Sequence, residues 1–437
     1  MPVSATATRE SPEGTSMRGV VMSRSSTLIR RRSTLIGSTL IGSTSAVTME
    51  RMGTFVGAAE ATRILGVRPE TLYAYVSRGL IGRRVGPDGR RSLYDRDDIE
   101  ALARRGRSRT SPPRPSIDVQ VASAVTSLDE EGPSYRGRPL VELARSATFE
   151  QVAELLWTGE LPDDPVRWSA PSAADRELAA AIVTVVGRPG LGALTAAATV
   201  LAERSADDAP AVAARRLLVL APQLVTGVDG GKGSTAERLV RAWTGRAERR
   251  LVEAVDTALV MLADHELTTS TLAARVAASV RPPAYDALAA GLSTLAGRLH
   301  GAAAGEVVGL LVDARTVGAA AAIDRILDAS QPVPGFGHSI YKRRDPRFAP
   351  LLDSVTALAD PDGWAPTVAD VLAAAGSRVP AAPNVDFGLG ALLLTAGLSP
   401  DAPLFAVARL AGLGAHVAEE MGERPVRFRG LTRSTRS

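Results

Sequence analysis

Cysteine is absent from the 437-residue chain, and histidine occurs only four times, at positions 265, 300, 338 and 416. The absence of cysteine excludes disulfides, thiolate nucleophiles, iron–sulfur clusters and cysteine-ligated zinc. Four histidines in so long a chain also argue against a histidine-rich site. We therefore predict no bound metal.

Aromatic residues are scarce at 4%, whereas hydrophobic residues make up 45% and charged residues 22%, as in an ordinary soluble globular protein. With so few aromatic rings, the core must consist mainly of Ala, Leu and Val. This composition favours many closely packed helices over a β-sandwich. At roughly 150 residues per domain, the length indicates two or three domains.

The chain has no long apolar run. Its longest uncharged stretch, Ser33–Met49, has 17 residues, of which ten are Ser, Thr or Gly. A membrane-spanning helix needs about 20 mostly apolar residues. We therefore expect a soluble, cytoplasmic protein with no membrane partner.

Residues 1–50 are low in complexity, with the sequence STLI repeated three times and Glu10, Glu13 and Glu50 as the only acidic residues. An Arg- and Ser-rich, acid-poor beginning is typical of a transit peptide. The segment lacks amphipathic helical periodicity, however. This favours a disordered extension, or an upstream start ahead of Met49 or Met52.

Residues 51–105 form the first predicted domain. The pattern indicates a short helix, a turn, a second helix, a basic hairpin and a closing helix, at 55–66, 67–69, 70–78, 83–91 and 94–104. Throughout 55–100 this order resembles the winged helix-turn-helix of the MerR family. The domain is also basic, since residues 51–110 hold thirteen Arg against seven Asp and Glu.

A helix-turn-helix of this kind places its second helix in the major groove of DNA, while basic groups nearby bind phosphates. The candidate contacts are Arg68, Thr71, Tyr73, Tyr75, Arg78, Arg83, Arg84, Arg90 and Arg91. The alternative is a module of the same shape that mediates assembly and never binds DNA. The residues favour neither, so DNA is a possible partner through 55–100.

Residues 106–116 read as a linker, because three prolines in a short polar run cannot continue a helix. The remaining residues, 117–437, predict an almost entirely α-helical domain. The clearest helical patterns cover 139–158, 174–186, 209–221, 249–263, 267–279, 284–298, 303–313, 364–376 and 402–422. Only 119–136 alternates like strands, which predicts a small hairpin.

Gly227–Ser234 has the glycines of a phosphate loop but not its pattern. A Walker loop requires Gly at position 226 and Ser or Thr at position 233, where this chain has Thr226 and Gly233. We interpret the segment as a surface turn.

Several polar groups lie in apolar or Gly-rich surroundings in this domain. His265 lies in an Asp-His-Glu sequence after an apolar stretch, and His300 immediately precedes Gly301 ahead of a new helix. His338 ends a Gly-rich loop, and Asp386 lies within an apolar run. Together, two histidines and one desolvated carboxylate can supply an acid, a base and a donor that polarises a carbonyl.

The segments that carry these groups are LHG at 299–301, PGFGHSIYKRRDPRF at 334–348 and NVDF at 384–387. They resemble the three catalytic segments of citrate synthases, and 147–162 and 264–279 resemble further segments of that family. The resemblance covers essentially all of 117–437. A citrate synthase domain behind a MerR-like helix-turn-helix also resembles a domain arrangement of GC-rich bacteria.

This resemblance implies an all-α homodimer with a large and a small helical subdomain, the small one at about 301–400. It also implies a tricarboxylic acid cycle transferase that condenses oxaloacetate with acetyl-CoA to citrate and CoA. The CoA thioester is a substrate, and no cofactor is expected.

The resemblance also implies roles for single residues. Asp386 matches the carboxylate that removes a proton from acetyl-CoA, and its apolar setting is expected to raise its pKa. His300 matches the histidine that binds the thioester oxygen, and its place at a helix N-terminus favours the neutral ring. His338 matches the histidine that polarises the oxaloacetate carbonyl, and His265 matches a further oxaloacetate-binding histidine.

Arginine forks suit a dicarboxylate. Arg347 and Arg409 match two of the family's arginines, and a third, supplied by the partner subunit, corresponds by its spacing to Arg429, with Arg424 and Arg427 as alternatives. The resemblance further assigns Gly335, Phe336 and Gly337 to the CoA adenine, and Lys342, Arg343 and Arg344 are candidates for its phosphates.

The chain departs from the family pattern beside these groups. Arg298 replaces the proline that commonly precedes LHG, Ala302–Ala304 replaces a Gly-Ala-Asn type run, and Gly388-Leu389 replaces a Tyr-Ser pair. The departures leave two alternatives open. One is a 2-methylcitrate synthase that uses propionyl-CoA, and the other is a DNA-binding regulator whose citrate synthase-like domain senses a metabolite without turnover.

Overall fold

The computed structural model describes residues 55–67, 69–77, 80–86, 91–107, 119–129, 132–297, 300–301, 303–338, 340–341 and 343–429. The chain divides into two compact units, residues 1–118 and 119–437. The predictions for residues 1–50, 108–116, Arg68, Arg78, Arg90, Arg298, Ala302 and Lys342 lie outside the described residues. Residues 106 and 107, predicted to begin the linker, instead belong to the last helix of the first unit.

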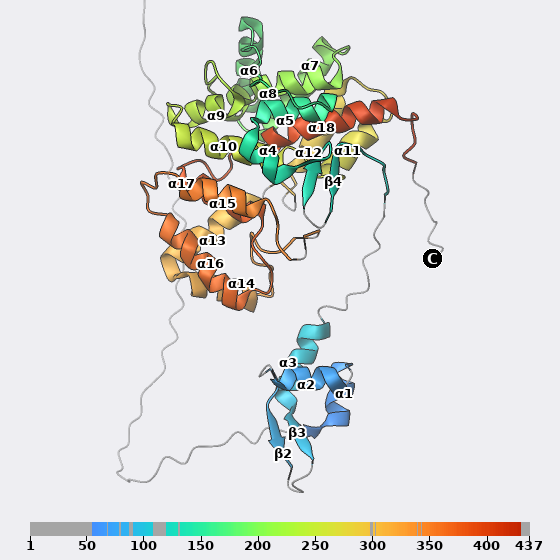
Figure 1. The fold of residues 1–437 in the computed structure, drawn as a ribbon, viewed down its shortest axis with the longest axis vertical. Helices are drawn as coiled ribbons and strands as arrows, with labels where there is room; N and C mark the ends of the chain where they lie inside the picture. The colour runs from blue at the N-terminus through green and yellow to red at the C-terminus, as the bar shows by residue number, and fades with distance from the viewer. Residues whose placement is uncertain are drawn as a thin grey trace, which may run out of the picture. The chain divides into compact units, whose positions relative to one another are not determined.

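The first unit contains three helices and a three-stranded antiparallel sheet in its described part (Figure 1). In chain order these are β1 (Phe55–Gly57), α1 (Ala58–Leu65), α2 (Pro69–Ser77), β2 (Arg83–Val85), β3 (Ser92–Asp95) and α3 (Arg96–Arg107). The helical assignment of 55–57 and 94–95 was wrong. Val56 pairs with Tyr94 across β1 and β3, and both side chains are buried, so tertiary pairing overrides the local helical pattern.

The second unit is almost entirely helical, as the composition predicts. Its helices are α4 (Leu140–Ser146), α5 (Phe149–Thr158), α6 (Ala173–Val186), α7 (Leu191–Arg204), α8 (Pro210–Thr226), α9 (Thr235–Thr244), α10 (Arg249–Leu262), α11 (Thr269–Ala278), α12 (Ala284–Leu295), α13 (Ala303–Val317), α14 (Ala319–Asp328), α15 (Phe348–Thr356), α16 (Ala365–Arg378), α17 (Val385–Thr395) and α18 (Leu404–Gly422). The predicted hairpin is a three-stranded antiparallel sheet of β4 (Thr126–Leu128), β5 (Pro133–Tyr135) and β6 (Arg138–Pro139).

The helix predicted at 139–158 is two helices. Thr148 has extended backbone angles and forms a capping box with Gln151, in which each side chain accepts a hydrogen bond from the other residue's backbone N–H. This arrangement satisfies free N–H groups at the start of α5 and separates it from α4. The sequence pattern also missed α7, α9, α14, α15 and α17.

The core of this unit lies around α18, which packs on α5, α8, α10, α11 and α12. Glycine allows a close approach at one point. A Cβ at Gly412 would lie 2.3 Å from the Asp264 carboxylate, so only glycine brings α18 this close to the end of α10.

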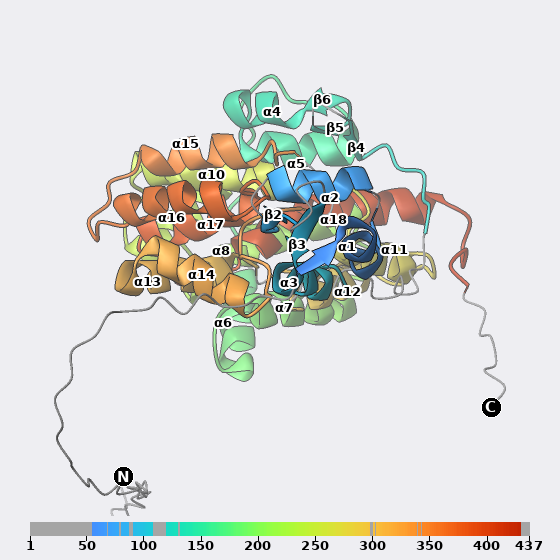
Figure 2. The ribbon, with the colours of Figure 1, turned by 90° about the horizontal axis from the view of Figure 1, so that it is seen from below.

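Helices α13 to α17 gather at one end of the unit in both ribbon views, with α15 beside α10 (Figures 1 and 2). Within the group, α13 packs on α14, α16 and α17. The boundary of 301–400 for a small subdomain stays a prediction. Among the described residues, no helix is long and apolar enough to cross a membrane.

Candidate active site

Six of the predicted site residues line one cavity of about 390 Å³: His265, His300, His338, Arg347, Asp386 and Arg409. They come from segments that are far apart in the sequence. His265 follows α10, His300 precedes α13, His338 and Arg347 lie between α14 and α15, Asp386 lies in the first turn of α17, and Arg409 lies within α18.

Asp386 is positioned by the start of α17. Asn384 caps this helix, because its side-chain oxygen accepts hydrogen bonds from the backbone N–H groups of Asp386 and Phe387, at 3.0 and 3.3 Å. Burial raises the pKa of the Asp386 carboxyl to about 6, although the charge of Arg347 opposes this shift. A carboxylate with a pKa near neutrality is a stronger base than an ordinary aspartate.

His338 presents one defined ring nitrogen to the cavity. Its Nδ1 accepts hydrogen bonds from the backbone N–H groups of Ile340 and Tyr341, at 3.1 and 3.3 Å. These two donors favour the neutral ring with its proton on Nε2. Arg347 Nη2, which can only donate, lies 3.5 Å from Nε2, and the two shorter backbone contacts at Nδ1 outweigh this longer one. Nε2 can therefore donate a hydrogen bond to a carbonyl oxygen.

His300 is oriented by Ser270, the second residue of α11. Its Nε2 lies 2.9 Å from the Ser270 hydroxyl and 3.4 Å from the Ser270 backbone N–H. Burial lowers the pKa of His300, and the positive charge of Arg409 adds to this shift. The ring is therefore neutral near pH 7, and with Nε2 as acceptor its proton lies on Nδ1.

The two arginines are buried and held differently. Asp345 binds Arg347 through both carboxylate oxygens, at 2.9 and 2.8 Å, and also accepts the Val385 backbone N–H at 3.0 Å. Arg409 donates to the Leu262 carbonyl and to the Thr268 hydroxyl. These contacts fix two cations at the cavity wall, where an anionic group can bind.

His265 is held against Tyr341 and His338. Its Nε2 lies 3.0 Å from the Tyr341 hydroxyl, and Tyr341 stacks on His338 with ring centroids 4.7 Å apart. Burial lowers the pKa of His265 to about 2, with the charges of Arg347 and Arg409 as further causes. His265 is therefore uncharged at neutral pH.

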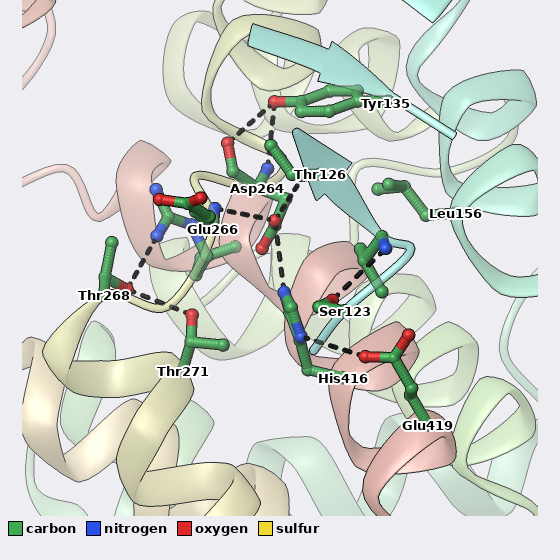
Figure 3. A network of polar contacts seen from close by, with 12 residues as sticks. Ser123, Thr126, Tyr135, Leu156, Asp264, Glu266, Thr268, Thr271, His416 and Glu419 are labelled. Atoms are coloured by element: carbon green, nitrogen blue, oxygen red, sulfur yellow. Dashed lines mark hydrogen bonds and ion pairs between the residues drawn. The ribbon is translucent and has the colours of Figure 1, made fainter. Parts of the chain in front are cut away.

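A buried carboxylate fixes the loop that carries His265 (Figure 3). Asp264 Oδ2 accepts hydrogen bonds from Thr126 Oγ1, the Glu266 backbone N–H and His416 Nε2, at 2.6, 3.0 and 3.2 Å. The Tyr135 hydroxyl accepts from the Asp264 N–H and donates to the Asp264 carbonyl. Burial alone raises the pKa of Asp264, but its interactions with His416, Arg409 and Thr126 lower it to about 2.

The contacts of Asp264 continue away from the cavity through His416. His416 Nδ1 lies 2.9 Å from Arg275 Nη1, which can only donate, so Nδ1 accepts and the ring proton lies on Nε2, facing Asp264. Arg275 in turn pairs with Glu419 and Glu420 at 2.6 and 3.0 Å. A continuous chain of polar side chains thus joins the His265 loop to the end of α18.

Residues 118–429 match the family model described as citrate synthase, C-terminal domain, and residues 55–107 match a helix-turn-helix domain. The first match spans more than half of the chain. The chain belongs to the citrate synthase family.

Individual relatives agree with this assignment. A 2-methylcitrate synthase of Mycobacterium tuberculosis is 27% identical, over 70% of this chain and 88% of its own length. A citrate synthase of Synechocystis is 31% identical, over 66% of this chain and 81% of its own length. The crystal structure of Thermotoga maritima citrate synthase has the same fold, with a TM-score of 0.58 at 23% identity, covering 72% of this chain and 93% of that one.

Five of the predicted residues do not line the cavity of this citrate synthase domain: Gly335, Phe336, Gly337, Arg343 and Arg429. The glycine loop is packed rather than open, because a Cβ at Gly335 would lie 2.8 Å from Phe387. Arg343 and Arg429 are exposed. Arg427, one of the alternatives to Arg429, is paired with Glu420 within its own chain.

Four residues that shape the cavity were not predicted from the sequence: Ser270, Tyr341, Asp345 and Phe405. Tyr341 and Asp345 lie inside the segment 334–348 that carries the family resemblance, so that segment held the signal. Ser270 likewise lies inside the segment 264–279 that resembles the family, whereas Phe405 lies in none of the segments that carry the resemblance. Among the described residues, no group of three or more His, Asp or Glu is placed to hold a metal ion.

We predict that Thr126→Val lowers the free energy of unfolding by about 2 kcal/mol. The substitution keeps the side-chain shape but removes one of the three donors to the buried Asp264 carboxylate. Thr126→Ser, which keeps the hydroxyl, is the matched control, and urea denaturation measures both. Equal stabilities of the Val and Ser variants would contradict the importance of this hydrogen bond.

Proposed function

We propose that the chain condenses oxaloacetate with acetyl-CoA to give citrate and CoA. The observation that carries the proposal is the convergence of a raised-pKa carboxylate, two donor histidines and two buried arginines on one cavity. Curated relatives named citrate synthase support the same reaction.

Oxaloacetate binding would use the cationic side of the cavity. Arg347 and Arg409 offer N–H donors to the two carboxylates, and each is at most 3% exposed, so the pairing takes place largely away from water. His338 Nε2–H then donates to the ketone oxygen and makes the carbonyl carbon more electrophilic. The neutral His265 lines the same cavity and completes the binding site.

The carbon–carbon bond would form in two steps, deprotonation of the acetyl group and attack on the ketone. Asp386 removes a proton from the acetyl methyl group while His300 Nδ1–H stabilises the charge that develops on the thioester oxygen. The resulting enol carbon attacks the oxaloacetate carbonyl carbon, whose oxygen takes up a proton to become the hydroxyl. Water then hydrolyses the citryl thioester and releases CoA.

For CoA itself, we place the adenine at Gly335, Phe336 and Gly337 and the phosphates at Lys342 and Arg343. Phe336 is half-buried and its backbone bridges to Pro383, which joins this loop to the start of α17, where Asp386 lies. Arg343 is exposed and can reach an anionic ligand in solvent.

We further propose a homodimer in which Arg429 enters the partner's cavity. Large apolar side chains are exposed on neighbouring helices, with Val200 on α7, Val212 on α8, and Val276 on α11. Helices α7 and α8 pack on each other, α7 and α11 both pack on α12, and exposed apolar side chains are what an interface between two copies would cover. Arg429 is exposed, whereas Arg427 is paired internally, which favours Arg429 for this role.

Propionyl-CoA is the alternative acyl donor, because relatives named 2-methylcitrate synthase match as well as those named citrate synthase. One additional methylene changes selectivity by only about 1–3 kcal/mol. The two activities therefore differ by a small change in the cavity wall.

We predict CoA release from acetyl-CoA with oxaloacetate, and a loss of about 10²–10⁴-fold in kcat for Asp386→Ala. Asp370→Ala, which removes an exposed carboxylate on α16, is the matched control and should retain the wild-type rate. A thiol assay with acetyl-CoA and propionyl-CoA measures both rates. If neither thioester turns over while oxaloacetate still raises the melting temperature, the metabolite-sensing regulator replaces the enzyme.

The pH dependence follows from Asp386. Its pKa lies above the ordinary value, at about 6, and the base must be ionised to act. We therefore expect kcat to be level above this pH and to fall about tenfold for each unit below it. A profile of kcat between pH 5 and 8 measures this, and an unchanged kcat down to pH 5 would assign the base to another group.

The helix-turn-helix unit is proposed to bind DNA. Tyr73 on α2 is 54% exposed, and Arg83 and Arg84 on β2 are exposed, although the Arg84 guanidinium also lies over the Phe55 ring at 3.5 Å. An exposed aromatic side chain on the second helix suits contacts in a groove, and exposed arginines on the strand suit contacts with phosphates.

We predict that the full chain retards genomic DNA fragments in gel shifts, that binding weakens steeply with salt, and that Arg83→Ala lowers the salt slope by about 1. Arg249→Ala, an exposed arginine of the other unit, is the control. No binding at low salt would leave assembly as the role of the unit.

A further inference from the structure

A second cavity, of about 280 Å³, is lined by residues of α5, α8 and α9 and of the loops that precede α6 and α9. None of its described lining residues lines the active-site cavity. Gly231, Lys232 and Gly233, from the glycine-rich segment 227–234, form part of its wall. A single water molecule needs far less room, so the cavity can hold a small metabolite.

The glycine-rich segment is held in one conformation by two arginines of α9. Arg238 donates to the Asp229 carboxylate at 2.8 Å, and Arg241 donates to the backbone carbonyls of Gly230 and Lys232. Gly230 has a φ of +76°, and a Cβ there would lie 2.2 Å from the Arg238 carbonyl oxygen, so this position requires glycine. The segment is therefore a fixed part of the cavity wall.

Two buried side chains on this wall have polar atoms without a hydrogen-bond partner among the described residues. Glu150 is 2% exposed, and its Oε1 accepts the Thr235 backbone N–H at 2.6 Å, whereas its Oε2 has no partner. Arg238 is 4% exposed, and its Nε–H has no partner either. Because an unpaired buried polar group is costly, two of them on the wall of one cavity indicate a polar ligand.

The charges on the wall favour an anion. Arg167, Lys232 and Arg238 supply three cations. Arg238 is paired with Asp229 at 2.8 Å and Arg167 with Glu237 at 3.7 Å, whereas no ion pair joins Lys232 to a described residue. Lys232 is exposed, so its ammonium group is available to a ligand.

Glu150 is the one carboxyl among the described lining residues, and it does not oppose an anion. Burial raises its pKa, which favours the uncharged form. In that form Oε2 can carry the proton and donate a hydrogen bond to a ligand oxygen, while Oε1 keeps its bond to the Thr235 N–H.

Trp168 forms the apolar part of the wall and can report on a ligand. Its ring stacks on Trp157 with centroids 5.7 Å apart, and its Nε1–H donates to Glu154 at 2.9 Å. These two contacts fix the indole at the cavity. A charged group that binds there changes the surroundings of Trp168, and with them its fluorescence.

We propose that this cavity binds the oxyanion group, a phosphate or a carboxylate, of a small metabolite. Lys232 supplies the free positive charge, and Arg238 Nε–H and Glu150 Oε2 supply the hydrogen bonds. The site does not depend on the proposed condensation, because the two cavities have no described lining residue in common.

The experiment titrates the tryptophan fluorescence of the full chain with pyrophosphate and with malonate at constant ionic strength. We expect a saturable change in the wild type that is lost in Trp168→Phe, which retains an aromatic ring. The probe with the lower Kd identifies the group as phosphate or carboxylate.

Three variants test the wall. Lys232→Ala should raise the Kd about tenfold, because it removes a charged hydrogen-bond donor. Arg325→Ala removes an exposed cation of α14 and is the matched control, with a Kd within about twofold of the wild type. Glu150→Gln keeps the acceptor for the Thr235 N–H and puts an NH₂ donor in place of Oε2, so it should bind at least as tightly as the wild type.

Three results would overturn the site. No saturable change with either probe, or the same change in Trp168→Phe, would show that no oxyanion binds in this cavity. Equal Kd values for Lys232→Ala and Arg325→Ala would place the anion elsewhere. Weaker binding by Glu150→Gln would mean that the cavity takes a cationic group instead.

Discussion

The buried carboxylate of Asp264 is the interaction on which the rest of the site depends. A buried charge is tolerated only when hydrogen bonds replace its hydration, and here the donors come from β4, from the backbone of the adjoining loop and from α18. All three donors bind Oδ2 and thereby fix three segments relative to one another, while Oδ1 is buried with no hydrogen-bond partner among the described residues. His265, the next residue, is held in the cavity by the same contacts.

Burial disfavours the charged form of every ionisable group in the site, so it shifts the pKa values of the carboxyl and of the histidines in opposite directions. Burial raises the pKa of Asp386 and lowers those of His265 and His300, and the two arginines lower the histidines further. The result is a carboxylate base whose pKa of about 6 is close to neutral pH, beside uncharged imidazole rings that can donate hydrogen bonds. This is the combination that removing a proton next to a thioester requires.

Two of the positions at which this sequence departs from the citrate synthase pattern line the same cavity. Ala304, in the run that replaces a Gly-Ala-Asn type sequence, and Leu389, in the pair that replaces Tyr-Ser, both contribute to this mostly apolar cavity of about 160 Å³, which shares Phe405 with the active-site cavity. The acid–base groups are retained in the active-site cavity itself.

The sequence by itself determined the helical class, because few aromatics and much Ala and Leu leave helix packing as the way to build a core. It also determined the family, through the three segments that carry His300, His338 with Arg347, and Asp386. The tertiary structure alone decided which ring nitrogen His300 presents, that Tyr341 holds His265, and that Phe405 packs against His300. These are contacts between residues distant in the chain, and no local pattern encodes them.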